Sequence, residues 1–117
     1  KNSIFIIAGP QNEKKLITNI LEYKKKNIYD LFGTSNLIEI FHIMKICDLF
    51  IGNDSGLGHI ASALDINTFT IFGPGEPHRY RPWGQKARWF QDKQKEIKKI
   101  KPKDIYKKII DLKYEIN

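Results

Sequence analysis

Short apolar runs alternate along this chain with segments whose apolar residues recur at helical spacing. The run Ser3–Ala8 is continuous, rich in isoleucine and closed by Gly9-Pro10, which is typical of a strand buried on both faces. Residues 27–33, 47–52 and 67–73 predict three further strands, each ending at a glycine. The pattern therefore predicts several short strands rather than one long β-hairpin.

The segments between these strands predict helices. Asn12 is the expected cap of the first helix, and Asn36 has capping-box spacing with Glu39 at the start of the second. A short helix rich in small residues is expected to begin near Gly56, and a closing helix covers residues 104–116. The side chains expected on buried faces are Leu16, Ile17, Ile20 and Leu21 in the first helix, Leu37, Ile40, Phe41 and Met44 in the second, and Ile105, Ile109, Leu112 and Ile116 in the last.

Strands that alternate with helices predict an α/β fold with a parallel sheet and helices on both faces. The 117 residues are enough for one domain with a core of its own. Because the chain begins directly on a predicted strand, we expect residues 1–117 to form a single, incomplete domain of a longer protein.

The net charge of +7 rests on seventeen lysines against three arginines. Such an excess can attract nucleic acid, anionic lipid or a phosphorylated substrate, or can simply keep the surface solvated. Nucleic-acid sites favour arginine forks and stacked aromatic rings, whereas these lysines alternate with acids. The charge pattern favours a solvated surface, and nucleic-acid binding by the lysine-rich C-terminal third stays as an alternative.

Cysteine usage and hydropathy indicate a compartment. The single Cys47 excludes an internal disulfide and is typical of a reducing environment. No apolar run is long enough to cross a bilayer, and the N-terminal apolar segment is too short for a signal peptide. We expect a cytoplasmic protein.

The run from Ile51 to Leu64, IGNDSGLGHIASAL, carries the most unusual chemistry in the chain. A hydrolase nucleophile elbow needs a glycine two residues to either side of its serine, but Ser55 has Asn53 and Leu57 there. Three scattered histidines in an α/β pattern also form no recognisable triad. The residues therefore disfavour a serine nucleophile.

The same run predicts a phosphate cradle. Gly56, Gly58 and Ala61 have G-x-G-x-x-A spacing between a predicted strand and a predicted helix. Free N–H groups at a helix start attract anions, and glycine lets an anion approach the backbone closely. His59 could donate to a phosphate from the first turn or simply lie on the helix surface. Asp54 would repel a phosphate, so its expected role is to cap the helix or bind a hydroxyl group.

The run Cys47–Gly84 closely resembles the C-terminal, nucleotide-sugar-binding half of glycosyltransferase family 9, the ADP-heptose:lipopolysaccharide heptosyltransferases. That family shows D-[ST]-G-x-x-H-x-A-x-A-L followed by a strand ending in F-G-P-x-x-P. The matching residues here are Asp54, Ser55, Gly56, His59, Ala61, Ala63 and Leu64, then Phe72, Gly73, Pro74 and Pro77. The loops GPQNEKKL and GTSNLIEI also resemble family segments.

The resemblance implies a GT-B fold, with two Rossmann-like domains, inverting transfer and no metal ion or other cofactor. The implied donor-binding residues are Ser55, Gly56 and His59 toward the diphosphate, Asp54 toward the sugar hydroxyls, Glu13 toward the ribose, and Thr34 and Ser35 near the base, with Leu57 as a further donor-binding residue. The family's catalytic base belongs to the N-terminal domain, so no catalytic residue is expected in this chain. A phosphate-binding lysine that follows the first strand of the family's C-terminal domain also has no counterpart here.

The implied partners are a nucleotide-sugar donor, most simply ADP-heptose, and a phosphorylated glycolipid acceptor held by the other domain. The resemblance also implies contact with the cytoplasmic face of the inner membrane and no nucleic acid. Arg79 and Arg81 could face the acceptor, or could pair with Glu76 and Asp92, and Trp83 is expected in the core or the cleft wall. The alternative to an enzyme half is a non-catalytic module that binds a nucleotide sugar or phosphate.

Overall fold

The structure is a computed structural model that describes residues 3–22 and 26–116, with only the helical backbone for residues 113–116. Its elements follow one another in the order β1 (Phe5–Ile7), the 3₁₀ segment η1 (Gln11–Ile17), α1 (Thr18–Glu22), β2 (Ile28–Asp30), α2 (Leu37–Met44), β3 (Leu49–Asn53), α3 (Gly56–Ala63), β4 (Asn67–Phe72), α4 (Pro77–Tyr80), β5 (Ala87–Gln91), η2 (Ile97–Lys99) and α5 (Pro102–Ile116). The chain divides into two compact units, Lys1–Ile43 and Met44–Asn117.

Both units contain a parallel sheet, as the alternation of strands and helices predicts. In the first unit β1 pairs with β2, and Phe5 lies opposite Ile28. In the second unit the strand order is β3-β4-β5, and both pairings are parallel. The α/β fold class is therefore confirmed.

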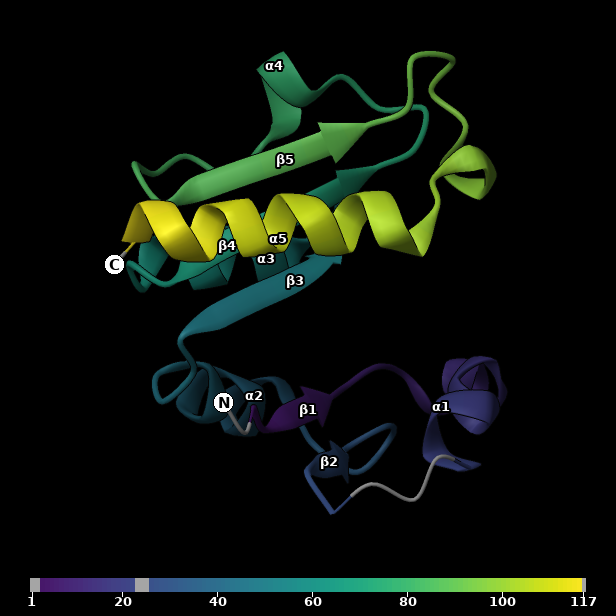
Figure 1. Cartoon of the computed structure of the whole chain (residues 1–117). Coiled ribbons are helices and arrows are strands. Elements are labelled where there is room, and N and C mark those ends of the chain that lie inside the picture. The colour runs from purple at the N-terminus through teal and green to yellow at the C-terminus, as the bar shows by residue number, and fades with distance from the viewer. Residues whose placement is uncertain (1–2, 23–25, 117) are drawn as a thin grey trace. The chain divides into compact units, whose positions relative to one another are not determined.

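The core of the second unit is centred on β4. Thr68, Phe69, Thr70 and Phe72 on this strand are all buried, because β4 has a strand on each side and a helix over each face. Figure 1 shows α5 in front of the three-stranded sheet and α3 behind it. Ile105 of α5 and Ala61 of α3 are buried as well. This packing fixes the loops at the carboxyl ends of the three strands.

Several apolar side chains of the first unit are more exposed than the sequence predicts. Phe5 of β1 is 52% exposed, although a strand buried on both faces was expected, because only β2 flanks β1 in the described chain. The apolar helix stripes are also only partly covered, since Leu16 is 74% and Leu37 61% exposed. The predicted burial of Phe5, Leu16 and Leu37 was therefore wrong, whereas the predicted burial of Ile17 and Met44 is confirmed.

Three local details also depart from the sequence pattern. The first helical segment begins at Gln11 as a 3₁₀ helix, with Pro10 in the capping position and no side-chain cap, so Asn12 does not cap it. The strand β5 was not predicted, because Arg88 and Gln91 break the apolar run of its sequence. The short helix α4 begins with Pro77 at its first turn.

Candidate functional site

The turn between β3 and α3 forms the candidate site. β3 ends at Asn53, Ser55 has the extended backbone of a cap residue, with φ −154° and ψ 165°, and α3 begins at Gly56. These bounds confirm the predicted strand, turn and helix start. Because β3 pairs in parallel with β4, this turn lies at the carboxyl edge of the sheet, where ligands of open α/β sheets bind.

The first turn of α3 leaves hydrogen-bonding groups unused. The Ser55 side chain makes no capping hydrogen bond, and the N–H of Gly58 donates to the Ser55 carbonyl oxygen at 3.2 Å. The N–H groups of Gly56 and Leu57 have no acceptor in the part of the chain that the structure describes. A helix start normally satisfies such groups by side chains, water or a ligand. These two donors are available to an anion.

The two glycines of this turn have different surroundings. A Cβ built on Gly56 would meet no atom within 4 Å, so the space in front of this residue is open. A Cβ on Gly58 would lie 3.4 Å from Pro82 and 3.6 Å from the Thr70 hydroxyl, and Gly58 is buried. Gly56 therefore faces outward at the helix start, while Gly58 packs α3 against β4 and the 81–84 segment.

Asp54 lies beside the neighbouring loop that follows β4. A Cβ on Gly75 would be 3.2 Å from the Asp54 carboxylate. The Gln91 side chain, at the end of β5, donates to the carbonyl oxygens of Gly73 and Gly75 at 2.7 Å each. Gln91 thus fixes the loop that flanks Asp54. Sequence pattern does not predict this role of Gln91, because the role depends on β5 lying beside β4.

His59 and the arginines following β4 are exposed. His59 lies on the first turn of α3. The guanidinium of Arg79 lies 5.4 Å from the centre of the Tyr80 ring. Within the described residues neither Arg79 nor Arg81 pairs with Glu76 or Asp92, and the Asp92 carboxylate instead accepts from the N–H of Gln94 at 2.9 Å. The surface ion pairs offered as one alternative are absent from this part of the structure.

Trp83 does not lie in the core, because it is 85% exposed. Its carbonyl oxygen accepts from the Ser62 hydroxyl at 3.0 Å, and Gly84 packs against the same hydroxyl. The backbone of this segment is therefore held along α3 while the indole ring points away. The prediction of a core position for Trp83 was wrong.

The remaining predicted residues, Glu13, Thr34 and Ser35, belong to the first unit. The N–H of Gly33 donates to the Gly9 carbonyl oxygen at 2.9 Å, and Gly33 has a positive φ of 67° in close contact with Gln11. This contact brings the loop after β2 next to the start of η1. Glu13 and Thr34 therefore come from adjacent loops at the carboxyl ends of β1 and β2, and both are exposed.

Two titratable groups outside the candidate site have shifted pKa values. A hydrogen bond from the Phe32 N–H, together with the Lys14 ammonium, lowers the pKa of Asp30. Partial burial, with a further contribution from the Asp48 carboxylate, raises the pKa of the Cys47 thiol. Neither group lies in the turn that carries Asp54 and Ser55.

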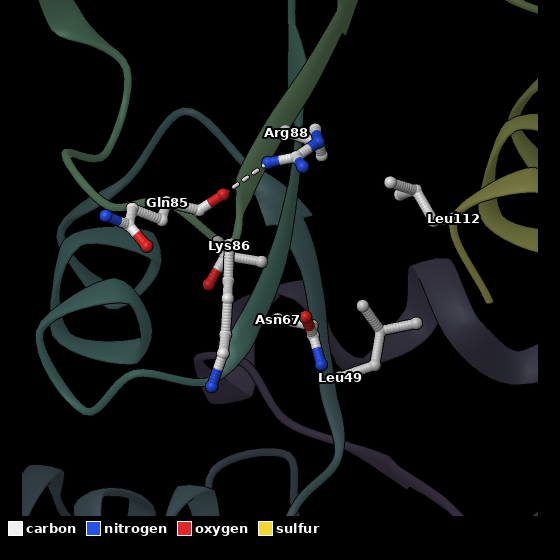
Figure 2. A pocket seen from close by; sticks show the side chains of 7 residues that line it. Leu49, Asn67, Gln85, Lys86, Arg88 and Leu112 are labelled. Carbon is white, nitrogen blue, oxygen red and sulfur yellow. Dashed lines mark hydrogen bonds between the residues drawn. The ribbon is translucent and has the colours of Figure 1, made fainter. Parts of the chain in front are cut away.

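A cavity of about 400 Å³ lies at the opposite, amino edge of the three-stranded sheet (Figure 2). It is lined by Leu49, Asn67, Thr68, Gln85, Lys86, Arg88 and Leu112. Both of its cations are already engaged: Lys86 pairs with Asp65 at 2.6 Å, and Arg88 donates to the Gln85 and Ala87 carbonyl oxygens. The candidate anion-binding groups are therefore those of the open turn between β3 and α3, at the other end of the strands, and not the side chains of this cavity.

Comparison with known proteins decides the family of this chain. The model of the family described as glycosyltransferase family 9 (heptosyltransferase) matches residues 1–110. The chain belongs to glycosyltransferase family 9. It is 31% identical over 85 residues to a lipooligosaccharide heptosyltransferase 2 of Campylobacter jejuni, which covers 70% of this chain and 27% of that protein. It is 36% identical over 59 residues to the lipopolysaccharide heptosyltransferase 2 of Salmonella typhimurium, covering 50% and 17%.

Solved structures of family 9 share the fold. The structure of the Escherichia coli ADP-heptose lipopolysaccharide heptosyltransferase II matches with a TM-score of 0.79 and 22% identity, over 93% of this chain and 36% of that one. A family 9 glycosyltransferase from Veillonella parvula matches with a TM-score of 0.82 and 19% identity, over 96% and 37%. The matches thus cover only 17% to 37% of the length of these relatives.

In the described residues, no helix is both long enough and apolar enough to span a membrane. They also contain no group of three or more His, Cys, Asp or Glu side chains placed to hold a metal ion.

Proposed function

We propose that this chain is the donor-binding half of an inverting, metal-independent GT-B glycosyltransferase of lipopolysaccharide core biosynthesis, with ADP-heptose as the donor. The observation that carries the proposal is the start of α3, where the N–H groups of Gly56 and Leu57 and the Ser55 hydroxyl have no partner among the described residues and the space in front of Gly56 is open. Membership of family 9 supports the same function.

The helix start would hold the donor diphosphate. The positive end of the α3 dipole and two unbonded N–H groups suit an anion, and His59 adds a donor one turn along. When the sugar–phosphate bond breaks, negative charge develops on the leaving nucleoside diphosphate. Fixed donors aimed at that charge stabilise the transition state without reorganisation. In this way a helix start supplies what a divalent cation supplies in metal-dependent transferases.

Asp54 would hold hydroxyl groups of the donor sugar. Its carboxylate adjoins Gly75 of the next loop. In the first unit, Glu13 would bind the ribose hydroxyls, with Thr34 and Ser35 near the base. Arg79 and Arg81 have no ion-pair partner among the described residues and would face the phosphorylated acceptor.

The catalytic base would come from an N-terminal acceptor-binding domain outside residues 1–117. We therefore expect the isolated chain to bind donor but to transfer no sugar. We place the full-length protein in the cytoplasm, at the inner face of the membrane that holds its glycolipid acceptor. Turnover by residues 1–117 alone would contradict this division of labour.

Calorimetry on the full-length protein with ADP and with ADP-heptose tests the proposal. Both ligands should bind, and ADP-heptose should be consumed when a lipid A–Kdo acceptor is added. Binding of both ligands without any transfer would favour the non-catalytic module instead. Failure of both ligands to bind would overturn the assignment of the α3 helix start as a donor site.

A further inference from the structure

The excess positive charge of the chain is concentrated in residues 93–108, which we term the lysine tract. This tract holds eight lysines and two acids, a net charge of +6, whereas the whole chain carries +7. The other residues are therefore almost neutral taken together. A charge so concentrated is expected to produce a local positive potential.

The lysines of the tract are available to a partner. All eight are exposed. Across the described residues only Lys99 among them forms an ion pair, with Glu96 at 3.0 Å, and it also contacts the Gln94 side chain. The second acid of the tract, Asp104, pairs with none of them in that part of the structure. The potential of the tract is thus largely uncompensated from within the chain.

Apolar side chains are exposed among these lysines. In α5 the buried Ile105 marks the inward face, so Lys103 and Lys107, four residues apart, lie together on the outward face. Tyr106 lies between them in the sequence and is 67% exposed, and Ile97 of η2 is 41% exposed. The tract therefore presents exposed lysines together with one aromatic and one aliphatic side chain, groups that suit a surface with anionic headgroups over an apolar layer.

The tract begins at the same edge of the sheet as the candidate donor site. It follows Gln91, which holds the Gly73 and Gly75 carbonyl oxygens, and Gly75 adjoins the Asp54 carboxylate. A Cβ on Gly73 would lie 3.6 Å from the Ile97 side chain. Figure 1 shows the segment 92–101 beyond the arrowheads of β4 and β5, which point to the carboxyl edge. A partner bound by the tract would lie next to this edge.

We propose that the lysine tract docks this protein on the surface of an anionic lipid bilayer. Lysines close to such a surface are attracted by its negative potential, and exposed Tyr106 and Ile97 can enter the headgroup layer. Nucleic acid is a poorer match, because the tract has no arginine and only one aromatic residue on which a base could stack. The purpose of the docking rests on the proposed function: it brings the donor site to a membrane that holds a glycolipid acceptor.

Flotation of the full-length protein with vesicles tests this inference. Vesicles of equal parts phosphatidylcholine and phosphatidylglycerol should bind the protein, and phosphatidylcholine alone should not. Lys103→Gln with Lys107→Gln should weaken binding by roughly 5-fold per lysine, or about 25-fold together. The matched control, Lys15→Gln with Lys26→Gln, removes the same charge from exposed positions outside the tract and should leave binding unchanged.

Three further measurements test the same inference. Tyr106→Ser should reduce vesicle binding most visibly at raised ionic strength, where the lysine contribution is screened. Equal losses in the two double variants, or equal binding to both kinds of vesicle, would overturn the proposal. Displacement from the vesicles by a single-stranded RNA oligonucleotide that binds the tract more tightly would overturn it in favour of nucleic acid. ADP affinity of the same preparations reports on the proposed function alone, so the failure of either proposal is recognised separately.

Discussion

Helices α2 and α3 both follow a strand of a parallel sheet, but their capping side chains are used differently. At α2 the Glu39 N–H donates to the Asn36 side chain and the Asn36 N–H donates to the Glu39 carboxylate, each at 2.9 Å. At α3 the capping residue Ser55 makes no side-chain bond, and the N–H groups of Gly56 and Leu57 find no acceptor in the described chain.

This difference separates a structural helix start from one that can bind a ligand. The capping box of α2 satisfies the N–H groups of Asn36 and Glu39 and occupies both of their side chains. The Leu37 and Ile38 N–H groups have no acceptor in the described chain, but the residues that carry them have bulky side chains where α3 begins with a glycine. The start of α3 leaves its donors unused and has a glycine with open space in front of it. Position at the end of a parallel strand and two unbonded N–H groups in the first turn are common to both helices in the described chain. The unused capping side chain of Ser55 and the open space in front of Gly56 distinguish the candidate site.

The largest effect is expected from Gly56→Val. A branched side chain would occupy the open space and keep a phosphate away from two N–H groups, each worth about 1.5–3 kcal/mol toward a charged oxygen. ADP affinity measured by calorimetry on the full-length protein should fall on the order of 100-fold. The melting temperature should change little, since a Cβ here meets no atom within 4 Å.

Ala63→Val is the matched control, because it places the same side chain at an exposed position at the other end of α3. It should leave ADP affinity unchanged. Similar losses in both variants would mean that valine disturbs the helix as a whole, and the distinction between α3 and α2 would lose its support.

His59→Ala and Asp54→Ala should distinguish the binding of the donor diphosphate from the binding of the donor sugar. Removal of the imidazole should weaken ADP binding about tenfold, the value of one hydrogen bond to a charged oxygen. Removal of the Asp54 carboxylate should leave ADP affinity nearly unchanged and lower the affinity for ADP-heptose. Calorimetry with both ligands distinguishes the two, and intact ADP affinity in His59→Ala would contradict the role of that side chain.

The sequence predicted the features that depend on neighbouring residues. The strand, turn and helix around Asp54 follow from local pattern and glycine placement, and so does the capping box of Asn36. It failed where tertiary contacts decide. Strand β5 takes its place through pairing with β4, and the Gln91 contacts to Gly73 and Gly75 exist only because of that pairing. The exposure of Phe5 depends likewise on which strands flank β1 and not on its own sequence.

Substitution of the two capping residues, Asn36 and Ser55, should change the free energy of unfolding by different amounts. Asn36→Ala removes a side-chain bond at the start of α2 and should lower the free energy of unfolding by about 1 kcal/mol. Ser55→Ala should cost almost none, because its hydroxyl makes no capping bond, but should weaken ADP binding several-fold. Denaturant unfolding and calorimetry on the same variants provide the two measurements. A stability loss in Ser55→Ala equal to that in Asn36→Ala would show that both helix starts are structural.

The smallest effect is expected at Asp30, the last residue of β2. Its carboxylate satisfies a backbone N–H of the turn that follows β2, as the capping side chains do at the start of α2. The Asp30 carboxylate accepts from the Phe32 N–H at 2.9 Å and lies 3.2 Å from the Lys14 ammonium. Both contacts favour the ionised form, so the pKa of Asp30 is lower in the folded chain than in the unfolded one. The stabilisation is therefore present above the unfolded pKa of about 4 and disappears as the pH falls through the folded pKa.

Asp30→Asn should lower the melting temperature slightly at neutral pH and not at all in strong acid. Lys14→Gln should have a smaller effect, because the backbone N–H is the larger cause of the shift. A melting-temperature difference that persists unchanged in strong acid would mean that Asp30 acts through its shape and not through its charge.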